Sequence, residues 1–387
     1  MKHFDVAVCG GGIAGVAAAL AASRRGKKVI LVEKQCVPGG LATSGLIYVY
    51  LPISDNRDVK IAGGLPEELL KQCQEYGPFT IEEKWSGIPD GDSGAHSNRY
   101  CCCFSPAGYG LTLEKMLRES GTEVRLETTV TQAYCNGKKR LEEIELFCGA
   151  ERENISAECF IDATGGAFLL RMAGEKVFPE TNYSTPWFME TNKHSRSAYH
   201  LTGDLHIQPI PVPAKDGQMA QVLSADELQE FIRRQYREIR RYYDTMSAKE
   251  RKVCYPVHLP GMPQLRKIAR ISAMAEIKAG EAGKFCADSV GIAADWRQTA
   301  TAWETPYGAL VPQTIRGALA AGRCINSSGD AWEVFRVIPA AAMTGEAAGI
   351  AAAMAAEQKL DPQDIPIADL QRELRKNGVI IHINDVE

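Results

Sequence analysis

The fold is decided by the stretch Val6-Ala7-Val8-Cys9-Gly10-Gly11-Gly12-Ile13-Ala14-Gly15. Residues 6–9 are apolar, which predicts a strand that is buried on both faces. An alanine-rich helix is predicted after the glycines, and a second apolar strand over residues 29–32 ends at Glu33. Strand, glycine turn, helix, strand and acid in this order predict a Rossmann-like unit that binds an adenine dinucleotide.

The glycines at the turn have separate physical tasks. Gly10 permits the tight turn, Gly12 lets a pyrophosphate approach the backbone, and Gly15 lets the helix pack closely on the sheet. The free N–H groups at the start of the helix would face the phosphates, so Ile13 and Ala14 belong to the same predicted site.

Glu33 follows the glycines by about twenty residues, the spacing at which an acid accepts hydrogen bonds from a ribose hydroxyl. Its neighbour Lys34 is assigned to the same cofactor site. The charge of Glu33 would repel a 2′-phosphate. This stretch alone leaves the choice between NAD and FAD open.

The bulk properties restrict the partners. A chain of 387 residues is long for one core and predicts two linked domains. The net charge of −4 argues against a nucleic-acid partner. Residues 1–5 lead into the first strand without a visible secretory signal, and residues 340–356 contain Glu346, so we expect a cytoplasmic protein without a membrane span. The oligomeric state is left open.

The twelve cysteines are scattered, apart from the run Cys101-Cys102-Cys103. No Cys-x-x-Cys pair or Cys/His spacing predicts a metal site, so we assign no metal ligand. In a reducing cytoplasm the thiols are expected to be reduced. We interpret the triplet as apolar filling, with a redox or metal role as the alternative.

The next motif is Cys36-Val37-Pro38-Gly39-Gly40-Leu41-Ala42-Thr43-Ser44-Gly45, whose glycines allow the backbone to pass close to a flat ligand. Here the chain resembles the FAD-dependent oxidoreductases of the glutathione-reductase structural class. The resemblance implies that Gly40, Leu41, Ala42 and Thr43 lie along the flavin of FAD. Disulfide reductases of that class carry a cysteine pair in this region, and this chain does not.

The middle of the chain is similar to the same class. Two alternating segments flank the turn Asn136-Gly137, which predicts a hairpin, and a further strand leads into Ala163-Thr164-Gly165. The resemblance implies that the backbone around Val130 contacts adenine. It also implies that Ala163, Thr164 and Gly165 return the chain beside the dinucleotide.

The last third carries two further motifs. Gly322 and Arg323 stand where many flavoproteins of the class have Ala-Gly-Asp, whose acid binds the ribityl chain, and Asp330 is a candidate for that role. The run Phe335-Arg336-Val337-Ile338-Pro339 opens an alanine-rich helix. The resemblance implies that this helix points its amino end at the flavin pyrimidine ring, with Arg336 and Pro339 at the cofactor.

Residues 176–299 have a different composition, rich in proline and aromatic residues, and contain the candidate catalytic groups. Ser224 and Glu227 predict a capped helix whose arginine-rich face is interpreted as solvated, with RNA docking as the alternative. His200 is a candidate for proton transfer. The run 265–271 resembles an arginine-rich segment of the family, so Arg270 is predicted either to bind a substrate carboxylate or to bridge the domains.

Together these patterns predict an α/β fold, with a Rossmann-like FAD-binding domain of the glutathione-reductase class and an inserted α+β substrate domain. The expected FAD-binding domain is discontinuous (1–60, 100–175 and 300–358). The substrate or cap domain comprises 61–99 and 176–299, and 359–387 form a tail. We expect hydride transfer between a small organic substrate and non-covalently bound FAD, with an unidentified electron acceptor, and Arg270, Arg336 and His200 as catalytic residues. The alternatives are an NAD-dependent dehydrogenase and a flavoprotein with an RNA- or partner-binding role.

Overall fold

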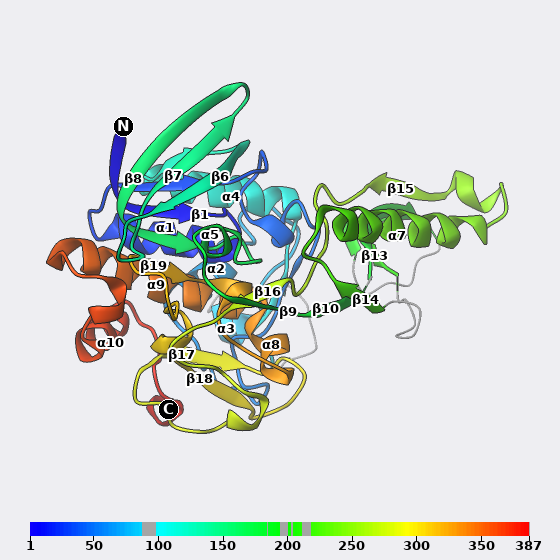
Figure 1. The fold of residues 1–387 in the computed structure, drawn as a ribbon. Coiled ribbons are helices and arrows are strands. Elements are labelled where there is room, and N and C mark those ends of the chain that lie inside the picture. The colour runs from blue at the N-terminus through cyan, green and yellow to red at the C-terminus, as the bar shows by residue number, and fades with distance from the viewer. Residues whose placement is uncertain (87–97, 184, 194–199, 203, 211–217, 387) are drawn as a thin grey trace.

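A seven-stranded sheet forms the centre of the molecule in the computed structural model, which describes the chain except residues 87–97, 184, 194–199, 203, 211–217 and 387 (Figure 1). Its strand order is β5-β2-β1-β8-β7-β6, with β19 pairing β8. The strands are β1 (Lys2–Cys9), β2 (Val29–Val32), β5 (Glu123–Arg125), β6 (Thr128–Cys135), β7 (Leu141–Cys148), β8 (Glu151–Asp162) and β19 (Ala318–Ala320).

The long strand β8 joins two kinds of pairing. It is parallel to β1 and, over Phe160 to Asp162, to β19, whereas its first half is antiparallel to β7. The parallel part is apolar and buried, as predicted for a sheet covered on both faces. The hairpin predicted at Asn136-Gly137 is confirmed by the pairing of β6 with β7.

Two helices from opposite ends of the chain pack against each other and the sheet: α1 (Ile13–Arg24) and α9 (Ile338–Gln358). A Cβ added at Gly345 or Gly349 of α9 would collide with the backbone of α1 at Ala14 or Ala18. The two backbones are therefore in direct contact. By length and composition α9 could cross a membrane, but 94% of its apolar window is buried inside the protein.

The other helices are α2 (Leu65–Gln72), α3 (Glu83–Ser86), α4 (Pro106–Glu119), α5 (Phe168–Met172), α7 (Ala225–Asp244), α8 (Asp330–Phe335) and α10 (Ile367–Lys376). Helix α2 packs on α9, where the buried carboxylate of Glu346 accepts a hydrogen bond from Leu65 N at 2.8 Å. Residues 65–72, expected in the substrate domain, thus lie against the helices of the cofactor domain.

The described residues also form four two-stranded sheets. These are β3 (Val49–Tyr50) with β4 (Cys102–Cys103), β9 (Val177–Pro179) with β16 (Ala269–Ile271), β10 (Thr181–Tyr183) with β14 (Gln218–Gln221), and β17 (Ser289–Ala294) with β18 (Ala302–Pro306). The β17–β18 hairpin packs on α9 through β17. The expected domain boundary between residues 299 and 300 falls inside this hairpin, because the two strands pair with each other across it.

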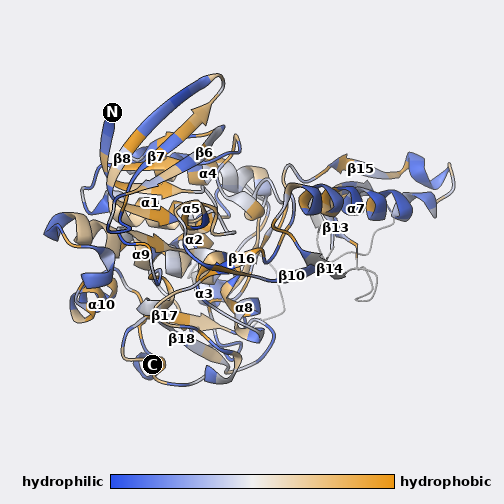
Figure 2. Cartoon of the chain, viewed as in Figure 1, coloured by the Kyte–Doolittle hydropathy of each residue, from blue (hydrophilic) through white to orange (hydrophobic). Residues whose placement is uncertain are grey.

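The segment 187–258, which we call the arm, projects from the body (Figure 1). Its sheet has the order β12-β13-β11-β15 and is covered by α7, whose capping box of Ser224 and Glu227 is present as predicted. The strands are β11 (Trp187–Asn192), β12 (His200–Thr202), β13 (Leu205–Pro209) and β15 (Cys254–His258). Figure 2 shows the outer face of α7 as hydrophilic, in contrast to the hydrophobic central sheet.

The arm is organised around the fully buried carboxylate of Glu190. It lies 3.0 Å from His206 Nε2 and accepts hydrogen bonds from Tyr243 Oη at 2.6 Å and Tyr242 Oη at 3.2 Å. The arginines of α7 face outward, and three of them lie within 4 Å of Glu230 or Glu238 on the same helix: Arg233, Arg237 and Arg241. These pairs agree with the solvated-face interpretation of this helix.

Candidate active site

A cavity of about 610 Å³ runs along the carboxyl ends of the parallel strands. Sixteen of the predicted cofactor residues line it: Gly10, Gly12, Ile13, Ala14, Glu33, Lys34, Gly40, Leu41, Ala42, Val130, Ala163, Thr164, Gly165, Gly322, Arg323 and Arg336. They come from both ends of the chain and from its middle. The carboxyl edge of a parallel sheet is the usual ligand site of such folds.

The glycine turn shapes the cavity wall at the start of α1. Gly10 has φ +104°, and a Cβ there would lie 2.5 Å from the carbonyl oxygen of Ala163. Gly12 differs, because a Cβ there would meet no protein atom within 4 Å. No side chain caps α1, so its first N–H groups are available to an anion in the cavity.

Glu33 lies beside the glycine turn, lines the same cavity and is only 6% exposed. Its carboxylate accepts hydrogen bonds from Gly11 N at 2.6 Å and Gln35 N at 2.9 Å. Burial raises the pKa of Glu33, and the two backbone N–H groups oppose that effect. Each oxygen keeps a lone pair, so the group can also accept from a ribose hydroxyl.

The loop of Gly40, Leu41 and Ala42 is a short 3-10 helix that lies against the glycine turn. Gly39 N donates to Gly11 O at 2.7 Å, and Gly40 has φ +57°, a conformation that favours glycine. Thr43 Oγ1 donates to Pro38 O at 2.7 Å. Thr43 therefore braces the loop and does not line the cavity.

The turn after β8 forms the facing wall. The fully buried Asp162 accepts hydrogen bonds from Thr164 Oγ1 at 2.6 Å and from Leu170 N at 2.9 Å. Burial raises the pKa of Asp162, and these hydrogen bonds oppose that effect. These hydrogen bonds of Asp162 hold the turn in place, and Ala163 and Thr164 of the turn line the cavity.

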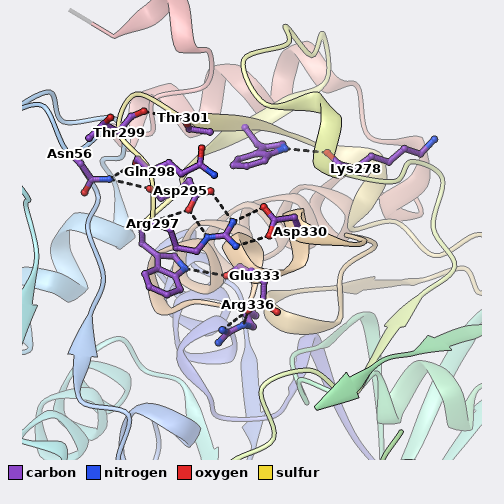
Figure 3. A network of polar contacts seen from close by, with 12 residues as sticks. Asn56, Lys278, Asp295, Arg297, Gln298, Thr299, Thr301, Asp330, Glu333 and Arg336 are labelled. Carbon is purple, nitrogen blue, oxygen red and sulfur yellow. Dashed lines mark hydrogen bonds and ion pairs between the residues drawn. The ribbon is translucent and has the colours of Figure 1, made fainter. Parts of the chain in front are cut away.

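The carboxyl-terminal part of the chain closes the cavity at a third side. Gly322 N donates to Thr344 Oγ1 of α9 at 3.0 Å, and Trp332 Nε1 donates to Arg323 O at 2.9 Å. The guanidinium of Arg323 lies against Gly165, whose φ of +74° favours glycine, and donates to Leu265 O. Arg336 Nε donates to Glu333 at 2.6 Å (Figure 3).

Four predicted cofactor residues do not line the cavity: Thr43, Gly15, Pro339 and Asp330. Gly15 and Pro339 support the helices behind the cavity wall: a Cβ at Gly15 would collide with Gly10 O, and Pro339 is buried in the first turn of α9. Asp330 does not line the cavity and is paired with Arg297 at 2.6 Å (Figure 3).

The predicted catalytic role of Arg270 is not supported by its position. Its guanidinium donates to Asn326, lies 3.4 Å from Glu276 and stacks on Phe178, and it does not line the cavity. The backbone of His200 pairs with His206 in the sheet of the arm. The side chain of His200 is outside the described part of the structure.

One wall of the cavity was missed by the sequence analysis. It is mainly apolar and is formed by α5, the start of α7 and the segment before β16, with Phe168, Leu169, Arg171, Met172, Leu228, Met262, Pro263, Leu265 and Ile268. Leu265 and Ile268 belong to the arginine-rich run 265–271, and the others carry no motif. The only signal was the position of α5 directly after the Ala-Thr-Gly turn.

The fold and this cavity define a dinucleotide-binding enzyme with a parallel-sheet core. The family model of FAD dependent oxidoreductases matches residues 5–253 and 236–374. The chain therefore belongs to the FAD dependent oxidoreductase family: it is an oxidoreductase, and FAD is its cofactor. The nicotinamide alternative is set aside by this match.

Two solved structures match the chain at low sequence identity. CabE, an aromatic hydroxylase from angucycline biosynthesis, has a TM-score of 0.50 at 12% identity, over 99% of this chain and 70% of CabE. A geranylgeranyl bacteriochlorophyll reductase-like protein of Thermoplasma acidophilum has a TM-score of 0.49 at 13% identity, over 100% of this chain and 86% of that protein. No curated protein sequence matches the chain.

The cavity fits FAD on two structural observations. The uncapped start of α1 and the open space beside Gly12 suit a diphosphate. The volume of about 610 Å³ and the mostly apolar walls suit a long ligand with aromatic rings at its ends.

Proposed function

We propose that the protein transfers a hydride between a small organic substrate and FAD that is bound non-covalently and fully extended. Its fold is assigned to the glutathione-reductase class of flavoproteins. The adenosine lies at Glu33 and Val130, the diphosphate at Gly12, and the isoalloxazine between Leu41 and Arg336. The observation that carries this proposal is that one cavity is lined by all of these residues, which come from distant parts of the chain.

The flavin supplies the hydride chemistry, and the chain supplies binding and orientation. The N–H groups at the start of α1 compensate the diphosphate charge. The first turn of α9, entered through Val337, has no side-chain cap, so its N–H groups favour negative charge on the pyrimidine side of the ring. The electron acceptor is a separate small molecule or protein. We place the protein in the cytoplasm, without a nucleic-acid or membrane partner.

The test uses two glycines of the same turn. A valine at Gly12 would project into the cavity without meeting protein atoms, so Gly12→Val should remove FAD while leaving the folded chain intact. Gly10→Val should reduce folding itself, because its side chain would meet Ala163 O at a positive φ. FAD released on denaturation, read by absorbance and fluorescence, and circular dichroism report the two effects separately.

Wild-type protein purified under mild conditions should be yellow and should release FAD. A Gly12→Val protein with full FAD content would overturn the assignment of the diphosphate to this turn. A colourless wild-type protein that releases another dinucleotide would overturn the arrangement as a whole.

A further inference from the structure

Four cationic side chains line the cavity: Lys34, Arg171, Arg323 and Arg336. Within the described parts of the chain, Arg336 is the one among them that forms an ion pair with a carboxylate, that of Glu333. Its Nε donates to Glu333 Oε2 at 2.6 Å, and its Nη2 lies 2.5 Å from the same oxygen (Figure 3). The positive charge of Arg336 is therefore partly compensated by an acid that does not itself line the cavity.

Arg336 occupies the corner between α8 and α9, where Val337 has an extended backbone. The backbone N–H of Arg336 donates to Trp332 O at 3.1 Å, so the main chain is fixed at this corner. Glu333 holds one edge of the guanidinium, formed by Nε and Nη2. No described residue accepts a hydrogen bond from Nη1, so the other edge of the guanidinium is available to a ligand in the cavity.

Glu333 is itself held by further groups. Its Oε1 lies 2.9 Å from Lys267 Nζ, and Trp296 Nε1 donates to its backbone carbonyl at 3.4 Å. Burial alone would raise the pKa of Glu333, but the charges of Arg336 and Lys267 lower it, so the side chain is ionised at neutral pH. One carboxylate thus shares its charge between a cation on the cavity wall and a cation outside it.

A second group of ion pairs fixes the start of the same helix, α8. Arg297 binds Asp330 through two contacts of 2.6 and 2.8 Å, and it binds the fully buried Asp295 at 2.9 Å (Figure 3). Asn56 Nδ2 donates to the backbone carbonyl of Asp295 at 3.1 Å. Helix α8 is therefore anchored at its first turn independently of the carboxylate of Glu333.

We propose that Glu333 is a positioning residue for the cofactor: by holding Arg336 and compensating part of its charge, it keeps the reduction potential of the bound flavin low. This inference rests on the proposed function, which places the isoalloxazine between Leu41 and Arg336. Reduction adds negative charge to the flavin, so an uncompensated arginine at the ring would raise the reduction potential. A carboxylate bound to that arginine opposes this effect, although it lies outside the cavity wall.

The experiment measures the reduction potential of the FAD-loaded protein at pH 7, by equilibration with a reference dye followed in the visible spectrum. Glu333→Gln removes the charge but keeps an oxygen that can accept from Arg336, and we expect its potential to be higher than that of the wild type. Glu333→Asp keeps the charge and should return the potential toward the wild-type value. Arg336→Met removes the cation and should lower the potential.

The double variant Arg336→Met/Glu333→Gln tests whether Glu333 acts through Arg336. Without the guanidinium, Glu333 keeps only its contact with Lys267 outside the cavity wall, so Glu333→Gln should raise the potential less in the Arg336→Met protein than in the wild type. Asp330→Asn is the matched control, because it removes an equal charge from the same helix but leaves the pair of Glu333 and Arg336 in place. Its shift should be smaller than that of Glu333→Gln.

FAD content separates this inference from the proposed function. Wild-type protein without FAD would refute the proposed function. An unchanged or lower potential in Glu333→Gln at normal FAD content would overturn the inference alone, and so would an equal shift in Asp330→Asn. Loss of FAD from Glu333→Gln would assign the pair with Arg336 to cofactor retention and overturn the role in the reduction potential. Normal FAD content together with a raised potential is the expected result.

Discussion

The cofactor-binding body and the arm are stabilised in opposite ways. In the body, α1 and α9 touch through alanine and glycine, so backbone packs on backbone beside an apolar sheet. In the arm, the sheet and α7 close over the ionisable side chain of Glu190, bound to a histidine and two tyrosines. Added side-chain volume should therefore destabilise the core of the body, and the loss of one hydrogen-bond acceptor should destabilise the core of the arm.

The largest effect should follow from Glu190→Ala, which leaves His206 and Tyr243 without their shared acceptor in a buried site. Removing one partner of such a network typically costs about 3–5 kcal/mol. We expect that loss to be confined to the arm. Limited proteolysis should cut within residues 187–258, while the body keeps its FAD.

The control for this variant is Glu230→Ala on the exposed face of α7, where the side chain is 49% exposed. Its pairs with Arg233 and Arg237 are 3.7 and 3.5 Å long, and we expect no measurable change in proteolysis. Loss of FAD from Glu190→Ala in step with cleavage of the arm would show that the two regions are not separate.

A smaller effect is expected from Gly345→Ala in the body. The added methyl group would collide with Ala14 O of α1, and overpacking of this kind typically costs about 1–3 kcal/mol. Thermal unfolding followed by flavin fluorescence should shift to lower temperature, with the proteolytic pattern of the arm unchanged. Gly137→Ala in the β6–β7 turn, where a Cβ meets nothing within 4 Å, should leave the transition in place.

A further effect concerns the pH dependence of stability and Glu346, the buried acid of the body. Burial raises its pKa from an ordinary value of 4.5 to about 8. Between these values the folded protein holds one more proton than the unfolded chain, so stability falls as pH rises, by up to about 1.4 kcal/mol per pH unit. This contribution is complete below the lower value and is lost by the time the pH passes about 8.

Glu346→Gln keeps an acceptor for Leu65 N but cannot ionise, so its free energy of unfolding should depend less on pH across that window. Chemical denaturation at pH 5, 6, 7 and 8 measures the difference between the two proteins. If the free energy of unfolding changed with pH equally in wild type and variant, the pH dependence would come from a group other than Glu346.

The same contrast explains what the sequence could predict. Close contact between backbones requires glycine or alanine, and such residues form motifs that can be recognised in the sequence. These motifs predicted the turn at Gly10, the loop at Gly40 and the start of α9. Asp330 was a candidate for the ribityl chain because Arg323 stands where many flavoproteins of the class have an aspartate, and nothing in the sequence shows that Arg297 binds Asp330. Glu190, His206 and Tyr243 are far apart in sequence and have no pattern in common.

The substrate side was predicted only in outline. The arginine-rich segment 265–271 was recognised, but it lines the cavity with Leu265 and Ile268, while the pairing of β16 with β9 places Arg270 beside Phe178. The apolar wall at Phe168 and Met262 depends on how α5 and the base of the arm approach the sheet. Neither arrangement follows from local periodicity.

The contact between α1 and α9 has a consequence for biosynthesis. The ribosome makes α1 among the first 24 residues, but its partner surface begins only at Ile338. Until then the growing chain holds a nearly complete sheet with an apolar helix unprotected on one side. We therefore expect nascent chains to depend on chaperones until α9 emerges, and FAD to be captured only after α9 has packed on α1.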